Sequence, residues 1–222
     1  ALMINTPNNP TGSVMDEETM RQIAEIAVKH DILVISDDVY NTLLYDGAKN
    51  TCIAAFPGMK ERTAVVNSLS KSYAMTGWRI GFVAGPAELV SAMTKCQENF
   101  NACANAPGQY AGTVALAHPE LCEELRKVFE NRRRLLLDGL KGIRGIESND
   151  PKGAFYVFAD ISSFGLSSAD FCNRLLDEQK VVCIPGSAFG ACGEGFIRIA
   201  YTCSDSDLVE AVARIKTFCE SL

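Results

Sequence analysis

Lys71 is the residue whose surroundings first indicate chemistry. It stands among small hydroxyl residues in the stretch SLSKSYAMTGWRIGF (68–82), directly after an apolar run typical of a buried strand. An amine at the end of a core strand is partly desolvated, which disfavours its charged form and makes it a nucleophile able to form a Schiff base. Taken alone, a lysine is typically an exposed surface residue, so only its neighbours can decide between the two interpretations.

Ser68 and Arg79 flank Lys71 and together could bind a phosphate. Ser68 offers a hydroxyl three residues before the lysine, and Arg79 offers a guanidinium fork eight residues after it. Such a fork matches the geometry of phosphate oxygens. The alternative is that Arg79 pairs with a surface carboxylate and Ser68 only ends a strand.

The segment ISDDVY (35–40) places two carboxylates at the carboxyl end of an apolar run. Open α/β sheets bind their ligands at that edge, so Asp37 could hold a cationic ring nitrogen. Alternatively, Asp37 or Asp38 caps the following turn. Tyr40 could direct its hydroxyl at the same site or simply pack.

Two further polar residues follow or interrupt apolar runs. The segment NTPNNPTG (5–12) is first a turn, because it combines two prolines, three asparagines and a glycine, and it could present the Asn9 amide to a ligand oxygen. Arg198 lies inside the apolar run GFIRIAY (195–201). An unpaired charge there would be costly, so we expect an anionic group to meet it.

Elements that could position these residues alternate through the first half of the chain. Apolar runs at 1–5, 32–38, 63–70 and 78–85 predict strands, the first two of them buried, and the amphipathic pattern at 16–30 predicts a helix. This alternation favours an α/β fold with a mostly parallel sheet. Further helices are predicted over 86–100 and after Pro107.

The pattern changes after residue 118. A long amphipathic helix at 119–141 precedes strands at 153–160, 181–185 and 195–201, and a last helix begins near Asp205 with Ser204 as its N-cap. The sequence therefore predicts two domains, a large one over 1–118 and a smaller α+β one over 119–222 that includes the long helix.

Composition excludes several classes of function. The net charge of -6 over 222 residues argues against nucleic acid as a partner, and the arginine run at 131–134 is predicted to lie on a solvated helix face. Apolar runs have only strand length, so no membrane span is expected. The nine cysteines form no CxxC pair and only two histidines accompany them, so no metal site is predicted. They are interpreted as reduced core thiols of a cytoplasmic protein.

Taken together, NNPTG, SDDVY, SLSKSYAMTGWRIGF and FIRIAY resemble, in order and spacing, the class I/II aminotransferases, which are fold type I pyridoxal-phosphate enzymes of the aspartate aminotransferase superfamily. The resemblance extends from residue 1 to the C-terminus. It implies part of the large cofactor-binding domain followed by the small C-terminal domain. It also implies an enzyme that transfers an amino group between an L-amino acid and a 2-keto acid, commonly as a homodimer.

The resemblance also implies a role for each motif residue. Lys71 would bind the cofactor pyridoxal 5'-phosphate covalently and shuttle the substrate proton, and Asp37 would hold the pyridine nitrogen. Asn9 and Tyr40 would bind the ring hydroxyl. Ser68 and Arg79 would bind the phosphate, and Arg198, with Asn9 nearby, the substrate carboxylate.

The sequence departs from the family pattern chiefly in length, because it begins where the family is already well advanced. An N-terminal arm, the opening sheet strands and a phosphate-binding loop are not in it. We therefore expect a poorly active form whose exposed sheet edges pair with another chain or rearrange. Two alternatives stay open at this point, a pyridoxal-phosphate-dependent carbon-sulfur β-lyase and a non-catalytic fragment.

Overall fold

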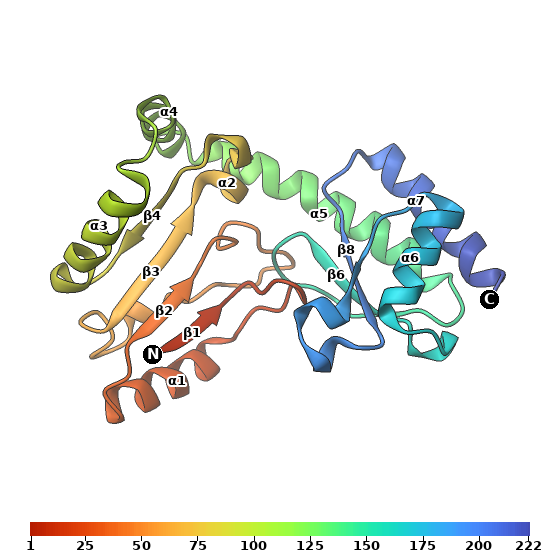
Figure 1. Ribbon diagram of the computed structural model, residues 1–222, viewed down its shortest axis with the longest axis horizontal. Helices are drawn as coiled ribbons and strands as arrows, with labels where there is room; N and C mark the ends of the chain where they lie inside the picture. Colours follow the sequence, from red (N-terminus) through yellow and green to blue (C-terminus); the bar gives the residue numbers. More distant parts are fainter. The chain divides into compact units, whose positions relative to one another are not determined.

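The computed structural model describes residues 1–222, which form two compact units (Figure 1). The first comprises Ala1–Asn8 and Ser13–Arg126, and the second comprises Asn9–Gly12 and Lys127–Leu222. The division falls inside the long helix α5 (Glu120–Lys141), whereas the predicted domains divide before it. The first turns of α5 belong with the first unit because Arg126 donates from Nη1 to the Leu44 carbonyl at 3.3 Å.

The sheet of the first unit confirms the predicted α/β class and the mostly parallel sheet. Its order is β1 (Leu2–Asn5), β2 (Val34–Asp37), β3 (Thr63–Ser68) and β4 (Gly81–Ala84). The first three strands are parallel and β4 is antiparallel to β3. The carboxyl ends of β1 to β3 and the amino end of β4 therefore lie at one edge of the sheet.

Helix α1 (Glu17–Lys29) covers one face of this sheet and runs beside β1 and β2 in Figure 1. The Asp16 carboxylate caps it by accepting from the Thr19 amide at 2.7 Å, and its inward face packs on the strands. The core between them contains Ile4, Met20, Ala24, Ala27, Val34, Ile53 and Met59.

The prediction of fully buried strands at 1–5 and 32–38 is wrong. Burial alternates along both, so that Ile4 and Val34 are buried whereas Met3 is 66% and Ile35 37% exposed. Successive side chains of a strand point to opposite faces, and only one face is covered by α1.

The first unit contains three further helices before α5. They are the one-turn α2 (Leu69–Ser72), α3 (Ala87–Asn101) and α4 (Ala106–Leu116). No residue of α3 is buried, and large apolar side chains remain exposed near its end and on α4, among them Phe100 at 84% and Tyr110 at 79%.

The second unit is an antiparallel sheet with two helices of its own and the larger part of α5. The strand order is β5 (Glu147–Ser148), β6 (Tyr156–Asp160), β8 (Phe196–Ala200) and β7 (Ile184–Pro185). Helix α6 (Ser168–Gln179) packs on α7 (Asp205–Glu220), where Phe171 and Phe218 meet at 5.1 Å between ring centroids. Ser204 caps α7 as predicted, by accepting from the Asp207 amide at 3.1 Å. Strand β5 was not predicted, and β7 is shorter than predicted.

Two expectations from composition need correction. Arg133 is only 3% exposed instead of lying on a solvated face, because its guanidinium binds Asp150 and the Pro151 carbonyl beside its helix. The cysteines are all free thiols, but they are not all core residues. Exposed ones are Cys96, Cys103, Cys192 and Cys203.

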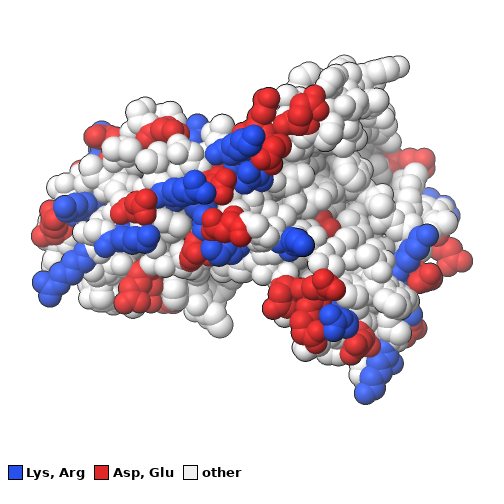
Figure 2. Space-filling view, turned by 180° about the vertical axis from the view of Figure 1, so that it is seen from behind, with Lys and Arg blue, Asp and Glu red and all other residues white.

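Surface charges of both signs lie close together. On the face drawn in Figure 2, lysine and arginine side chains lie among aspartates and glutamates. Some surface charges of the molecule form helical pairs one turn apart, such as Arg174 with Glu178 at 2.8 Å. None of the helices combines the length and the apolar character needed to cross a membrane.

Candidate functional site

Most predicted site residues gather at the carboxyl edge of the sheet in the first unit. In the register of the strands, Asn5 is opposite Asp37, and Ser68 is opposite Gly81. Arg79 lies two residues before β4 and so at the same edge. Strand topology therefore brings Asp37, Ser68, Lys71 and Arg79 to one edge, although they are spread over 43 positions of the chain.

Lys71 lies in α2, the one-turn helix that begins directly after β3. The Ser68 hydroxyl caps this helix by accepting from the Ser70 amide at 3.0 Å. The lysine is half-buried and not an ordinary exposed surface lysine. At the end of this segment, the Cys122 thiol hydrogen-bonds Tyr73 and raises the pKa of the phenol to about 12. The segment that carries Lys71 is therefore fixed by hydrogen bonds at both of its ends, Ser68 and Tyr73.

Ser68 and Arg79 line a hollow of about 790 Å³ within the first unit. Arg79 is exposed, donates from Nη1 to the Thr76 carbonyl at 3.0 Å and makes no ion pair, so the alternative of a surface carboxylate partner is wrong. The Ser68 hydroxyl donates to the Ile80 carbonyl at 3.1 Å. It must therefore turn before it can donate to an anion in the hollow.

The carboxylates that follow β2 differ in their surroundings. Asp37 is half-buried and accepts from the Val39 amide through Oδ1 at 3.3 Å, so it also caps the turn. Its Oδ2 makes no hydrogen bond within the protein. Asp38 is buried and accepts from the Ser36 hydroxyl at 2.6 Å, and burial raises the pKa of its carboxyl. Tyr40 is 4% exposed.

Arg198 and Asn9 form a second group, in the second unit. Arg198 donates from Nη1 to the Asn9 Oδ1 at 2.8 Å, which orients the amide with its oxygen toward the guanidinium. The Nε of Arg198 is buried and has no hydrogen-bond partner. A buried donor without a partner costs free energy, which an incoming carboxylate would recover. No carboxylate of the protein meets this arginine.

The sequence interpretation missed two aromatic residues that contact Arg198. The guanidinium carbon lies 4.5 Å from the Tyr156 ring centroid and 4.9 Å from the Phe189 ring centroid. The alternation in FYVF (155–158) and FIR (196–198) could have indicated Tyr156, because the two strands pair and share a face. No local signal indicates Phe189, which ends the 3-10 helix Gly186–Phe189 between β7 and β8.

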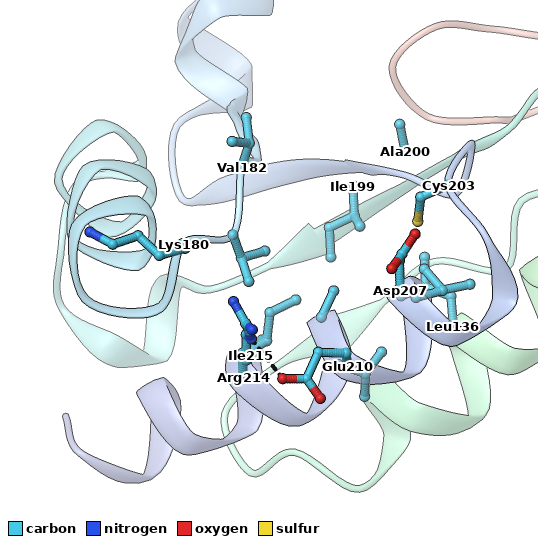
Figure 3. Close-up of a pocket in the computed structure, with 14 residues that line it drawn as sticks. Leu136, Lys180, Val182, Ile199, Ala200, Cys203, Asp207, Glu210, Arg214 and Ile215 are labelled. Atoms are coloured by element: carbon cyan, nitrogen blue, oxygen red, sulfur yellow. Dashed lines mark hydrogen bonds and ion pairs between the residues drawn. The ribbon is translucent and has the colours of Figure 1, made fainter.

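A further hollow of about 370 Å³ lies between β8 and α7 in the second unit (Figure 3). Its lining is largely aliphatic, with the Glu210–Arg214 ion pair at 2.8 Å on one side. None of the predicted site residues lines it. The predicted residues thus form two groups, one in each unit.

Comparison with known proteins gives consistent matches over almost the whole chain. Residues 1–215 match the family model described as aminotransferase class I and II. Among curated proteins, an aromatic-amino-acid aminotransferase of Thermococcus litoralis and an aspartate aminotransferase of Pyrococcus abyssi are each 45% identical over 219 residues. Both alignments cover 97% of this chain and 56% of the relative, so the chain spans little more than half of their length.

Solved structures agree with the sequence matches. The crystal structure of an aromatic aminotransferase from Pyrococcus horikoshii has a TM-score of 0.94 and 41% identity. The match covers 99% of this chain and 59% of that structure. All of these relatives carry aminotransferase names, and no observation favours the lyase alternative.

Proposed function

This chain belongs to the aminotransferase class I and II family, and on that basis we propose that it acts in pyridoxal-phosphate-dependent transfer of an amino group between an L-amino acid and a 2-keto acid. The observation that carries the proposal is the set of Asp37, Ser68, Lys71 and Arg79 at one edge of the sheet. The relatives are longer than this chain, so their activity is proposed for it and not carried over from their names.

The residues of the first unit fit the groups of the cofactor. Arg79, without an ion pair and beside a hollow, suits a phosphate dianion, and the Ser68 hydroxyl adds a second donor once it turns. The Oδ2 of Asp37 is available for a protonated pyridine nitrogen, and Tyr40 would bind the ring hydroxyl. Bound in this way, the cofactor supplies an aldehyde and a ring that accepts electrons from the substrate carbon.

Lys71 would act in two ways, as the covalent anchor of the cofactor and as the base of the reaction. Its Nζ would take the proton that leaves the substrate α-carbon and later return it. The cap at Ser68 supports this role, because it fixes the start of the turn that carries the amine. Fixed placement of a base contributes to the rate by lowering the entropy lost in the reaction.

Arg198 would bind the substrate α-carboxylate, with Asn9 as its positioning partner and as a ligand of the cofactor ring hydroxyl. The buried and unpartnered Nε supports this role, because a carboxylate would supply the missing acceptor. Both aspartate and aromatic-amino-acid enzymes occur among the relatives, so the proposal leaves the substrate side chain open.

We further propose a homodimer located in the cytoplasm. Exposed Phe100 and Tyr110 on α3 and α4 give apolar surface that association could bury, and nine free thiols are typical of a reducing compartment. Light scattering after size exclusion tests the dimer. A monomer at micromolar concentration would contradict it.

The test of the proposed function is covalent attachment of pyridoxal phosphate to Lys71. We expect an absorption band that depends on Lys71, and borohydride reduction should leave the cofactor mass on the peptide that contains it. Lys71→Ala should lose both. Lys60→Ala is the matched control, since Lys60 is an exposed lysine of the same unit. Equal labelling of Lys71→Ala and the parent chain would contradict the proposal.

Two further variants test the phosphate ligands. Arg79→Leu should weaken binding of pyridoxal phosphate while leaving the binding of pyridoxal, which has no phosphate, unchanged. Ser68→Ala should weaken the binding of both, because it also removes the cap of the helix that carries Lys71. When an amino acid and a 2-keto acid are added, the expected product is the amino acid that forms when the 2-keto acid receives the amino group. Release of pyruvate and ammonia would instead indicate the lyase reaction.

A further inference from the structure

The Arg198 guanidinium carbon lies over the ring of Phe189, and nothing in the sequence context of Phe189 assigns it a role. The guanidinium carbon lies 4.9 Å from its ring centroid and 4.5 Å from that of Tyr156. Tyr156 is a core residue of β6 at 6% exposure, whereas Phe189 comes from the loop between β7 and β8 and is 38% exposed. The loop residue is therefore the one that can change without disrupting the core.

Contact with the rings does not use the N–H donors of the guanidinium. A planar guanidinium that stacks on aromatic rings keeps its N–H donors in its own plane. One donor of Arg198, Nη1, is bound to the Asn9 Oδ1 at 2.8 Å, and another, Nε, is buried without a partner. Contact with the two rings thus limits how the guanidinium can turn, and with it the direction from which a carboxylate must approach.

The loop that carries Phe189 is itself held in place. A Cβ added to Gly186 would lie 2.0 Å from the Gly193 carbonyl oxygen, so the two ends of the loop are in backbone contact. The Glu194 carboxylate accepts from the Ser168 amide at 2.7 Å, and the Ser168 hydroxyl lies 3.0 Å from the Ser187 hydroxyl. These bonds tie the loop to the start of α6.

We propose that Phe189 is a positioning residue that holds the Arg198 guanidinium in the plane required to bind a substrate carboxylate. This inference rests on the proposed role of Arg198 as the carboxylate-binding residue. The 186–194 loop would thereby raise the affinity of Arg198 for a carboxylate without contacting the carboxylate itself.

The test measures carboxylate binding directly. Propionate is titrated into the chain while the resonance of the Arg198 Nε–H is followed by NMR, with Arg198→Lys used to assign the signal. Phe189→Leu keeps an apolar side chain but removes the ring, and should raise the dissociation constant about fivefold. Phe189→Tyr keeps the ring and should bind as the parent does. Propionamide, which has no charge, should not compete with propionate in either variant.

Phe164→Leu is the matched control, because it removes a ring of the same unit that packs on Phe171 and does not contact Arg198. It should leave propionate binding unchanged. If Phe189→Leu binds propionate as tightly as Phe189→Tyr, Phe189 only fills space and the inference is overturned, while the proposed function stands. If the parent chain shows no response at Arg198, both are overturned.

Discussion

Gly12 should be the glycine whose replacement most directly disturbs the Asn9–Arg198 pair. It ends the NNPTG segment, and its backbone has φ of +65°, a region that L-residues rarely adopt. Its carbonyl accepts from the amides of Lys152 and Gly153 at 3.0 and 2.9 Å. The segment that carries Asn9 is thereby fixed to the chain that leads into β6.

The cost of Gly12→Ala has two parts. The left-handed backbone costs about 1–2 kcal/mol for a residue with a Cβ. The added Cβ would also lie 2.4 Å from the Pro151 Cβ and 2.8 Å from the Gly153 carbonyl oxygen, so the neighbouring chain must move. Overpacking of this kind costs about 1–3 kcal/mol. The expected loss in free energy of unfolding is therefore about 2–5 kcal/mol.

Gly165→Ala separates the two parts. Gly165 lies in the same unit with φ of +67°, and a Cβ added there meets no atom within 4 Å. It should therefore lose only the backbone part, about 1–2 kcal/mol. Urea unfolding followed by circular dichroism measures both variants, and the Arg198 Nε–H resonance reports whether the Asn9 contact has moved. Equal losses for the two variants would refute the argument from close packing.

Three other predictions follow from single groups. Hydrogen bonds from the Ser168 amide and hydroxyl lower the pKa of the Glu194 carboxyl from its ordinary value in the folded state, so the stabilisation is present above the ordinary pKa and is lost as the pH falls through the lowered one. The difference in urea midpoint between Glu194→Gln and the parent should therefore be largest at pH 7 and should shrink as the pH falls, and a constant difference would be inconsistent with this. Ser204→Ala should cost about 1 kcal/mol through loss of the α7 cap, whereas Ser206→Ala, whose hydroxyl bonds the Ser204 hydroxyl but accepts from no amide of the helix, should cost less in thermal unfolding. A thiol reagent at pH 8 should label the exposed Cys96, Cys103, Cys192 and Cys203 before Cys183, because burial raises the pKa of the Cys183 thiol to about 12; mass spectrometry of the labelled peptides would expose early modification of Cys183.

Local patterns account for the elements that were predicted correctly. The helix at 16–30 has a capping aspartate, acidic residues in its first turn and an apolar face, and each of these signals acts within one or two turns. The strand β7 was overestimated because VVCIP (181–185) has strand propensity throughout, yet only Ile184 and Pro185 pair with β8. Pairing depends on a partner strand that local propensity cannot identify.

The sequence by itself determined which side chains could do chemistry and the edge at which most of them would meet. Lys71, Asp37 and Ser68 each follow an apolar run, and parallel strands bring such positions together wherever the strands pair. Burial was decided only by tertiary structure. Arg133 became a core residue through Asp150, and Arg198 gained the rings of Tyr156 and Phe189, because these contacts join segments that are distant in the chain and depend on how the strands and loops pack.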